Sequence, residues 1–254
     1  MATGIARLKD KVAVVTGGAQ GIGRGISLRL AEEGAKVAVA DINQDGAART
    51  AAEIGAAGGV ACPVKLDVTS LKSATAAADT IERQLGPVDI LVNNAGWDKV
   101  QHFLDTEEEL WDRLIDVNFK GVLICVKAFA PRMLNRPGSK IVSIASDAGR
   151  AGGVNDAVYS GCKGGVMAFT KTLARELARH KINVNAVSPG MIDTPLSQSI
   201  GASIPGYHER LDRIVPLRHH GQPSDIAAAV AYLASSDADY VTGQIISVNG
   251  GMTM

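Results

Sequence analysis

The sequence predicts an α/β fold: one domain built on a doubly wound, Rossmann-like parallel sheet of about seven strands, with helices on both faces. Two observations carry this prediction. Short β-branched runs alternate with longer segments of helical spacing along most of the 254 residues. The composition of 28 glycines with only 4% aromatic residues is typical of tight turns and aliphatic layers. We therefore treat 1–254 as a single domain.

The strand predictions come from apolar runs that are too uniform for a sheet with one wet face. Each run is short and rich in valine or isoleucine, which suits a strand covered on both sides. The predicted strands lie at residues 12–15, 36–40, 60–64, 89–92, 140–144, 182–187 and 245–248.

Helical spacing fills the segments between these runs, at residues 22–33, 47–54, 107–134 and 157–179. The connections are long enough for right-handed crossovers, which makes the sheet parallel. Residues 192–222 break the alternation with several prolines and glycines. Ligands bind beyond the carboxyl ends of such strands, so we interpret this stretch as a small substrate lid, the alternative being a surface insertion with no role.

Composition excludes several classes of function. Lys and Arg number 26 against 26 for Asp and Glu, which argues against nucleic-acid binding. No run approaches the roughly 20 apolar residues of a membrane span, and the start lacks the apolar core of a signal peptide. Cys62, Cys125 and Cys162 are scattered and fit neither a disulfide framework nor zinc spacing. We expect a cytoplasmic protein.

A glycine-rich turn follows the first predicted strand, where residues 16–23 read Thr-Gly-Gly-Ala-Gln-Gly-Ile-Gly, and a helix begins at once. Glycines let the backbone approach a pyrophosphate, whose charge then lies at the helix N-terminus. Asp41 closes the next strand and can accept hydrogen bonds from the adenosine ribose while repelling a 2′-phosphate. The pattern favours NAD over NADP; the alternative interpretation of Asp41 is a helix N-cap.

These motifs resemble the short-chain dehydrogenase/reductase family over almost the whole chain. The glycine turn, Asp67, the Asn93-Asn94-Ala95-Gly96 stretch and Pro189-Gly190 stand in the family's order. The resemblance implies cofactor contacts from residues of the strand ends. They are Gly17, Gln20, Gly21, Ile22, Asp41, Ile42, Asp67, Val68, Asn94, Ala95, Gly96, Tyr159, Lys163, Pro189, Gly190, Ile192 and Thr194.

Tyr159 and Lys163 lie at i and i+4, on one face of a predicted helix. Moving a hydride from an alcohol carbon requires the oxygen to lose a proton, and a nearby ammonium favours the phenolate that accepts it. The resemblance implies that Tyr159 is the acid/base and that Lys163 lowers its pKa and binds the nicotinamide ribose. It also implies that Ser146 binds the substrate oxygen. Ser143, a nearby alternative, should point to the opposite side of the strand from Ile144, toward packing.

Asn118 matches the family's asparagine whose backbone holds a water in the proton relay; the alternative is an amide on a helix surface. Substrate contacts are expected from Trp97, Asp147, Arg150 and Met191, besides Ser146. Asp98 and residues 196–214 are further candidates, and Arg150, Arg210 or Arg213 could meet an anionic group. His219 and His220 have no third ligand at metal spacing, so we expect no metal site.

The predicted reaction is the NAD-dependent interconversion of a secondary alcohol and a ketone. Asn-Asn-Ala-Gly-Trp-Asp and Ile-Ala-Ser-Asp-Ala resemble the family's 2-hydroxycyclohexanecarbonyl-CoA dehydrogenases, which implies a cyclic hydroxyacyl-CoA or other alicyclic substrate. The alternatives are an NADPH-dependent 3-oxoacyl-ACP or -CoA reductase, for which Gln20 and Ile42 lack the expected basic character, and a non-catalytic dinucleotide-binding protein. The resemblance also implies a homotetramer or homodimer.

Overall fold

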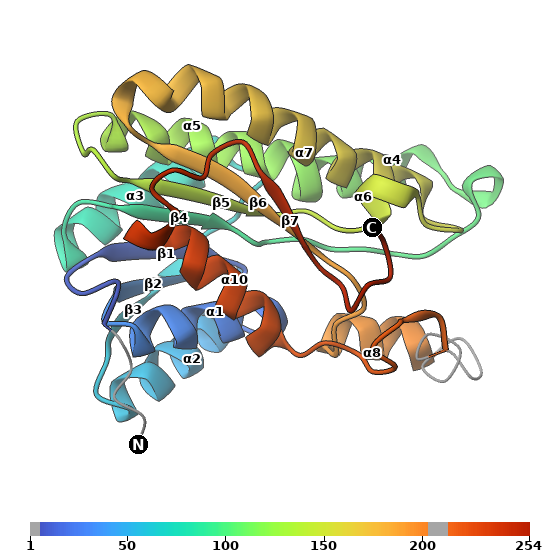
Figure 1. The fold of residues 1–254 in the computed structure, drawn as a ribbon, viewed down its shortest axis with the longest axis horizontal. Helices are drawn as coiled ribbons and strands as arrows, with labels where there is room; N and C mark the ends of the chain where they lie inside the picture. The colour runs from blue at the N-terminus through green and yellow to red at the C-terminus, as the bar shows by residue number, and fades with distance from the viewer. Residues whose placement is uncertain (1–5, 203–212) are drawn as a thin grey trace.

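A computed structural model of the chain describes residues 6–202 and 213–254 and contains one sheet of seven parallel strands (Figure 1). The predicted fold class is confirmed, and each predicted strand lies within two residues of an observed one. The strand order is β3-β2-β1-β4-β5-β6-β7. The strands are β1 Val12–Thr16, β2 Lys36–Asp41, β3 Val60–Lys65, β4 Ile90–Asn93, β5 Lys140–Ile144, β6 Asn183–Pro189 and β7 Ile245–Val248.

The strand order reverses direction at β1, which pairs with β2 on one side and with β4 on the other. The connections leaving β1 and β4 therefore separate and open a crevice between them. In doubly wound sheets, this switch point at the carboxyl ends of the strands is where ligands bind.

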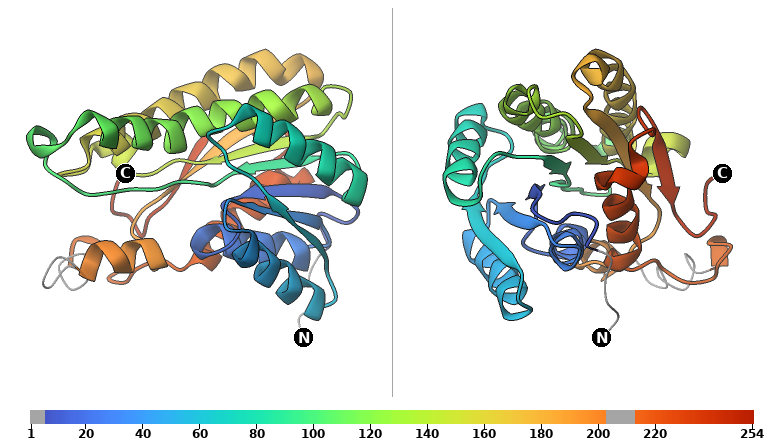
Figure 2. Two further views of the ribbon diagram at one scale, coloured as in Figure 1. Left: turned by 180° about the vertical axis from the view of Figure 1, so that it is seen from behind. Right: turned by 60° about the vertical axis from the view of Figure 1, so that its left-hand side comes forward.

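Helices cover both faces of the sheet. Figure 1 shows α4, α5 and α7 above the strands and α1, α2 and α10 below them, and the view from behind shows α3 beside α5 (Figure 2). The main helices are α1 Gly21–Glu32, α2 Gln44–Ala56, α3 Leu71–Leu85, α4 Glu108–Ile115, α5 Gly121–Met133, α7 Ala157–Leu177 and α10 Pro223–Ala234; shorter ones are α6 Ala148–Ala151, η1 Phe103–Asp105, η3 Ala178–His180 and η4 Ser236–Ala238.

Two aliphatic cores follow from this arrangement, one on each side of the sheet. Val14 and Leu91 face the layer that contains Phe129 of α5, whereas Val15 and Val92 face the layer that contains Ile26 of α1. Neighbouring strand residues point to opposite faces, so an unbroken apolar strand is buried on both. Burial of this kind is the main stabilising contribution to the fold.

Two helices that we did not single out from the sequence complete the alternation. The Ser70 side chain accepts a hydrogen bond from Ser73 N–H at the start of α3. Helix α10 begins with Pro223 and a capping box between Gln222 and Asp225. Both helices bury many alanines, which give a weak signal of hydrophobic periodicity.

The helix predicted over residues 107–134 is interrupted, and the prediction of one regular helix is wrong there. Helix α4 ends at Ile115, a π-helical turn η2 spans Asp116–Lys120, and α5 begins at Gly121. A π turn inserts an extra residue and shifts the faces of the helix on either side of it. Here the shift brings Asn118 to complete burial.

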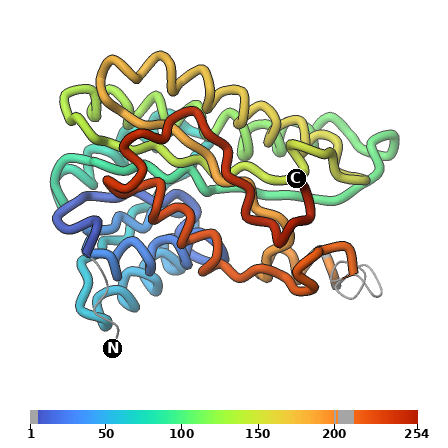
Figure 3. Tube along the Cα trace, in the orientation of Figure 1, coloured from blue at the N-terminus to red at the C-terminus, as the bar shows by residue number. Residues whose placement is uncertain are grey.

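The segment predicted as a lid begins with α8, Pro195–Ala202, and an isolated bridge joins Ile192 to Gly221 at its base. The tube in Figure 3 shows α8 beyond the strand ends. Residues 203–212, and with them Arg210, lie outside the described residues. Among the described helices, none is long and apolar enough to cross a membrane.

Candidate active site

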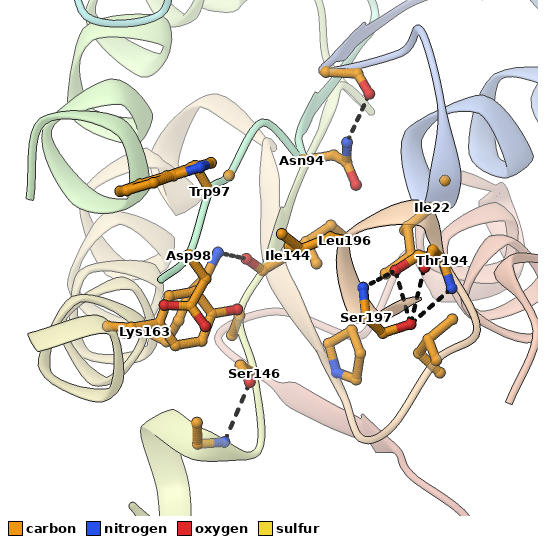
Figure 4. Close-up of a pocket in the computed structure, with 18 of the residues that line it drawn as sticks. Ile22, Asn94, Trp97, Asp98, Ile144, Ser146, Lys163, Thr194, Leu196 and Ser197 are labelled. Carbon is orange, nitrogen blue, oxygen red and sulfur yellow. Dashed lines mark hydrogen bonds between the residues drawn. The ribbon is translucent and has the colours of Figure 1, made fainter. Parts of the chain in front are cut away.

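A cavity of about 1250 Å³ opens at the carboxyl ends of the strands, at the switch point between β1 and β4 (Figure 4). All seventeen residues predicted to contact the cofactor line this cavity. Ser146, Trp97, Asp147 and Met191 also line it. The structure therefore brings most of the predicted site to one place.

The glycine turn after β1 is closely packed. Gly17 has a positive φ of 66°, and a Cβ on it would lie 2.9 Å from the backbone of Ala95. A Cβ on Gly23 would lie 2.1 Å from Gly17 O. Helix α1 then begins without a side-chain cap from Gln20, so its first N–H groups stay available to a ligand. Such a cradle fits the pyrophosphate of a dinucleotide.

The loops after β1 and β4 are joined through Thr16 and Asn94. The Thr16 hydroxyl accepts hydrogen bonds from the backbone N–H groups of Asn94 and Ala95, both at 3.0 Å. The Asn94 amide in turn donates to Thr16 O at 2.8 Å and to Gly17 O at 3.1 Å. Together these hydrogen bonds fix the glycine turn against the wall of the cavity.

Asp41 lies at the end of β2, where its carboxylate accepts from Ala19 N at 3.0 Å and from Asn43 N at 2.8 Å. The alternative interpretation of Asp41 as the cap of the next helix is wrong, because Asn43 caps α2 by accepting from Gly46 N–H. The carboxylate faces the same cavity as the exposed Ile42. Arg113 and Lys163, the described basic residues that line the cavity, come from α4 and α7.

Asp67 and Thr194, two further predicted contacts, also line the cavity. The Asp67 carboxylate accepts from the backbone N–H of Thr69 at 2.9 Å and from its hydroxyl at 2.7 Å. Thr194 and Ser197 exchange hydrogen bonds at the start of α8, where Figure 4 shows them together with Leu196. These hydrogen bonds cap the N-terminus of α8.

Helix α7 carries Tyr159 and Lys163 on one face, and Ser146 faces them from the loop after β5. Lys163 is 3% exposed and donates through Nζ to Ile144 O at 3.0 Å. Its Nζ lies 5.5 Å from the centre of the Tyr159 ring. Ser143, the neighbouring serine on β5, is buried and accepts from Asn93 Nδ2 at 3.3 Å, as predicted for a packing residue.

Burial shifts the pKa values of Tyr159 and Lys163. Burial and then the nearby Asp98 raise the pKa of Tyr159, while a hydrogen bond with Ser146 lowers it. Burial lowers the pKa of Lys163 to about 8. In the protein alone, these effects together raise the pKa of the Tyr159 phenol. The lowering of this pKa by Lys163, which the resemblance implies, stays a prediction.

Asn118 is completely buried, so its interpretation as a helix-surface amide is wrong. Its Oδ1 accepts from Trp97 N at 3.2 Å, and its Nδ2 donates to Trp97 O at 2.6 Å and to Leu114 O at 3.0 Å. The side chain thereby holds the loop after β4 against the π turn. Asn118 does not line the cavity itself, and it supports Trp97, which does.

The other predicted substrate residues occupy different positions. Asp147 is 2% exposed and accepts from Ser188 Oγ and Asn249 Nδ2, so it joins the loop after β5 to the segment after β7. Arg150 lies outside the cavity lining and donates to Ile245 O at 2.8 Å, so its prediction as a substrate contact is not supported by its position. Arg213 is exposed and also lies outside the lining.

Arg113 and Asp156 are two of the cavity-lining residues that we did not predict from the sequence. Arg113 lies over the Trp97 ring, with its guanidinium carbon 3.9 Å from the ring centre. Asp156 lies beside Asp98 at the start of α7. The sequence could predict neither contact, because the two residues of each contact lie in different segments of the chain.

We next looked for metal ligands and disulfide bonds among the residues that the structure describes. They include no group of three or more potential metal ligands, and all three cysteines are buried and free. His219 Nδ1 lies 2.9 Å from His220 O in an exposed turn. Cys162, inside α7, has its Sγ 3.7 Å from Leu114 O.

Comparisons with known proteins agree with this arrangement. A family model described as enoyl-(acyl carrier protein) reductase matches residues 17–253. The 3-oxoacyl-(acyl-carrier-protein) reductase FabG of Staphylococcus epidermidis is 40% identical over 96% of this chain and 100% of its own. The acetoacetyl-CoA reductase of Synechocystis is 43% identical over 96% of each chain. A short-chain type dehydrogenase/reductase of known structure from Mycobacterium marinum superposes with a TM-score of 0.93 at 36% identity, over 98% of both chains.

Proposed function

Because this chain belongs to the short-chain dehydrogenase/reductase family and is an oxidoreductase of CH–OH and keto groups, we propose that it uses NAD to interconvert a secondary alcohol and a ketone. The observation that carries the proposal is the convergence of Ser146, Tyr159 and Lys163 on one cavity whose other end is the glycine turn. A bound nicotinamide dinucleotide would supply or accept the hydride.

The residues divide into two functional groups. The glycine turn and the N-terminus of α1 hold the pyrophosphate, and Asp41 accepts hydrogen bonds from the adenosine ribose. Lys163, held by Ile144 O, donates to the nicotinamide ribose. Asn94, Gly96, Pro189 and the other predicted contacts form the walls that orient the cofactor.

The second group of residues carries out the proton transfer. Ser146 donates a hydrogen bond to the substrate oxygen, and Tyr159 gives a proton to that oxygen in reduction or takes one in oxidation. Asn118 keeps the loop of Trp97 in place, and its backbone holds the water that completes the proton relay. Trp97 and Met191 form the apolar wall of the substrate pocket.

The choice of NAD rests on Asp41. Its carboxylate would repel a 2′-phosphate, and Gln20 and Ile42 supply no positive charge at that end of the cavity. The names of the relatives favour a second candidate, a 3-oxoacyl-ACP or -CoA reductase. We propose NADPH as the cofactor of this second candidate. The two candidates share the catalytic group and differ in cofactor and substrate.

For the substrate we propose a cyclic hydroxyacyl-CoA or another alicyclic alcohol. The pocket supports this choice through the large flat surface of Trp97, which suits a ring. We propose one domain over 1–254 with a substrate loop at 192–222, in a cytoplasmic homotetramer or homodimer. Gly161 and Ala168 leave an exposed, small-residue face on α7 that suits close helix pairing.

Titration of the purified protein with NADH and with NADPH, followed by ligand fluorescence, tests the cofactor. Binding of NADH at least about tenfold tighter than NADPH supports the proposal. A preference for NADPH favours the 3-oxoacyl reductase, and binding of neither contradicts both candidates. Activity assays with an alicyclic hydroxyacyl-CoA and with acetoacetyl-CoA then separate the substrate classes.

A further inference from the structure

The residues that follow β7 turn back into the cavity, and we call residues 249–253 the post-β7 segment. Gly250 and Gly251 have positive φ values of 62° and 86°, a backbone conformation that suits glycine, and they reverse the chain. Met252 and Thr253 then line the cavity. Figure 1 shows the C-terminus beside α6, at the carboxyl ends of the strands. The post-β7 segment thus forms part of the cavity wall.

A buried carboxylate connects this segment to the loop that carries Ser146. Asp147 is 2% exposed, and its Oδ1 accepts a hydrogen bond from Ser188 Oγ at 2.9 Å. Its Oδ2 accepts from Asn249 Nδ2. The same nitrogen of Asn249 also donates to Thr253 O at 2.7 Å. Because Asp147 and Thr253 share one donor, the post-β7 segment lies next to the loop of Ser146.

The orientation of the Asn249 amide is fixed by its hydrogen bonds. Its Oδ1 accepts from Gly251 N at 2.9 Å, so its Nδ2 faces Asp147 and Thr253 O. A side-chain amide has an acceptor oxygen and two N–H donors, and these three contacts use all of them. Asn249 therefore holds the turn of the post-β7 segment and joins it to the buried carboxylate.

On its other side, the post-β7 segment packs against the end of the predicted lid. Gly250 O accepts a hydrogen bond from Leu217 N at 3.1 Å. A Cβ on Gly250 would lie 2.7 Å from the Val215 side chain, and one on Gly251 would lie 3.1 Å from Pro216. The post-β7 segment therefore lies between the loop of Ser146 and residues 215–217.

We propose that Asp147 and Asn249 are positioning residues that hold Met252 as a wall of the substrate pocket, so that Met252 limits the size of the alcohol that reaches Ser146. The inference rests on the proposed function, in which Ser146 binds the substrate oxygen. The Met252 side chain is apolar and half-buried, which suits a wall. Asp147 is too deeply buried to select a substrate by direct contact, so it acts through Asn249.

Two alcohols that differ only in bulk, cyclohexanol and 4-tert-butylcyclohexanol, test the selection. We expect Met252→Ala to raise the ratio of kcat/KM for the bulkier to the smaller alcohol by about tenfold, because the pocket gains the volume of the lost side chain. Asn249→Ala should raise the ratio in the same direction, because it releases the wall. An unchanged ratio in either variant overturns the proposal.

Asn185→Ala is the matched control. Asn185 is 1% exposed, and its amide holds the chain just before β7, where Nδ2 donates to Val241 O at 2.8 Å and Oδ1 accepts from Gln244 N at 3.0 Å. It lies outside the cavity lining. Loss of an amide beside β7 destabilises both variants, but only Asn249→Ala should change the ratio. An equal change in Asn185→Ala overturns the proposal.

The double variant Asn249→Ala/Met252→Ala tests whether Asn249 acts through Met252. If it does, the loss of Asn249 has nothing left to release once the Met252 side chain is gone. We therefore expect the double variant to change the ratio no further than Met252→Ala alone. Changes that multiply in the double variant mean that the two residues act independently, and they overturn the proposal.

Methyl NMR of methionine-labelled protein gives a readout without any substrate. The Met252 signal, assigned by its loss in Met252→Ala, should show greater picosecond-to-nanosecond mobility in Asn249→Ala and Asp147→Ala than in the parent protein, and unchanged mobility in Asn185→Ala. Equal mobility in Asn249→Ala and the parent overturns the proposal. The half-buried Asn249 keeps this test decisive even if Asp147→Ala does not fold.

The two proposals fail in different ways. Failure of the parent protein to bind NADH, or to oxidise any alcohol, would contradict the proposed function. In that case, or if neither cyclohexanol is oxidised, the Met252 signal still decides whether Asp147 and Asn249 hold the wall.

Discussion

The Asn118 side chain holds the backbone of Trp97 from both sides, with Oδ1 accepting from Trp97 N at 3.2 Å and Nδ2 donating to Trp97 O at 2.6 Å. A side-chain amide carries both an acceptor oxygen and a donor nitrogen. It can therefore hydrogen-bond the N–H and the C=O of one residue, as the backbone of a neighbouring strand would. The π turn is what points this amide inward. The part of the cavity wall that Trp97 forms therefore depends on a helix irregularity some twenty residues further along the chain.

Replacing Asn118 by Ala removes the hydrogen-bond partners of the Trp97 backbone N–H and C=O. We expect the free energy of unfolding to fall by about 1–3 kcal/mol, because buried backbone groups lose their hydrogen bonds. Chemical denaturation measures this change, and kcat/KM should fall as the Trp97 loop loosens. The exposed amide Asn135 provides the control, since Asn135→Ala should leave both quantities near their parent values.

Replacing Tyr159 by Phe removes the proton donor and keeps the ring. We expect turnover to fall by at least ~100-fold, the usual contribution of general acid/base catalysis, with NADH affinity retained. Steady-state kinetics and ligand fluorescence measure the two effects separately. Near-normal turnover would remove Tyr159 from the mechanism, and Tyr232→Phe, at a phenol outside the cavity lining, serves as the control.

Replacing Asp41 by Ala tests how the cofactor is chosen. A hydrogen bond to a charged group contributes about 1.5–3 kcal/mol, so we expect the ratio of NADPH to NADH dissociation constants to fall by about tenfold or more. Asp45→Ala, on the exposed first turn of α2, is the matched control. An unchanged ratio would mean that Asp41 does not distinguish the two cofactors.

The buried Lys163 should make the stability of the protein depend on pH. Burial lowers its pKa from 10.5 to about 8, so between these values the unfolded chain binds a proton that the native protein does not. Stability therefore rises with pH across this window, by roughly 3 kcal/mol at most. Denaturation at pH 7 and pH 10 should show this rise in the parent and in Lys171→Met, an exposed position on the same helix, but not in Lys163→Met. A parallel pH dependence in Lys163→Met would contradict it.

The strands and the cofactor end of the site could be predicted from the sequence because they depend on local patterns. An apolar run such as Val12–Thr16 predicts a buried strand wherever it occurs, and the glycine turn needs only its neighbours in the chain. Helix α3 was missed because its buried face contains Ala74, Ala77 and Ala78, which contribute little to periodicity. The π turn was missed because one extra residue leaves a helical pattern almost unchanged.

The substrate end could be predicted only in part. Asp98 and Asp156 meet because two loops pair, and Arg113 meets Trp97 because α4 lies against the loop after β4. Arg150 was expected near the substrate from its distance in sequence to Ser146, but the short helix α6 carries it away to β7. Contacts of this kind depend on tertiary packing that no local pattern encodes.

The hydrogen bonds between Thr16 and the Asn94-Ala95 backbone have a thermodynamic consequence for ligand binding. Since folding already orders the loops after β1 and β4, a dinucleotide entering between them finds them with little conformational entropy left to lose. Preorganisation couples thermal stability to cofactor affinity. A substitution that frees these loops therefore lowers the melting temperature and weakens cofactor binding together. Cofactor affinity in this protein is therefore partly acquired during folding, before any ligand arrives.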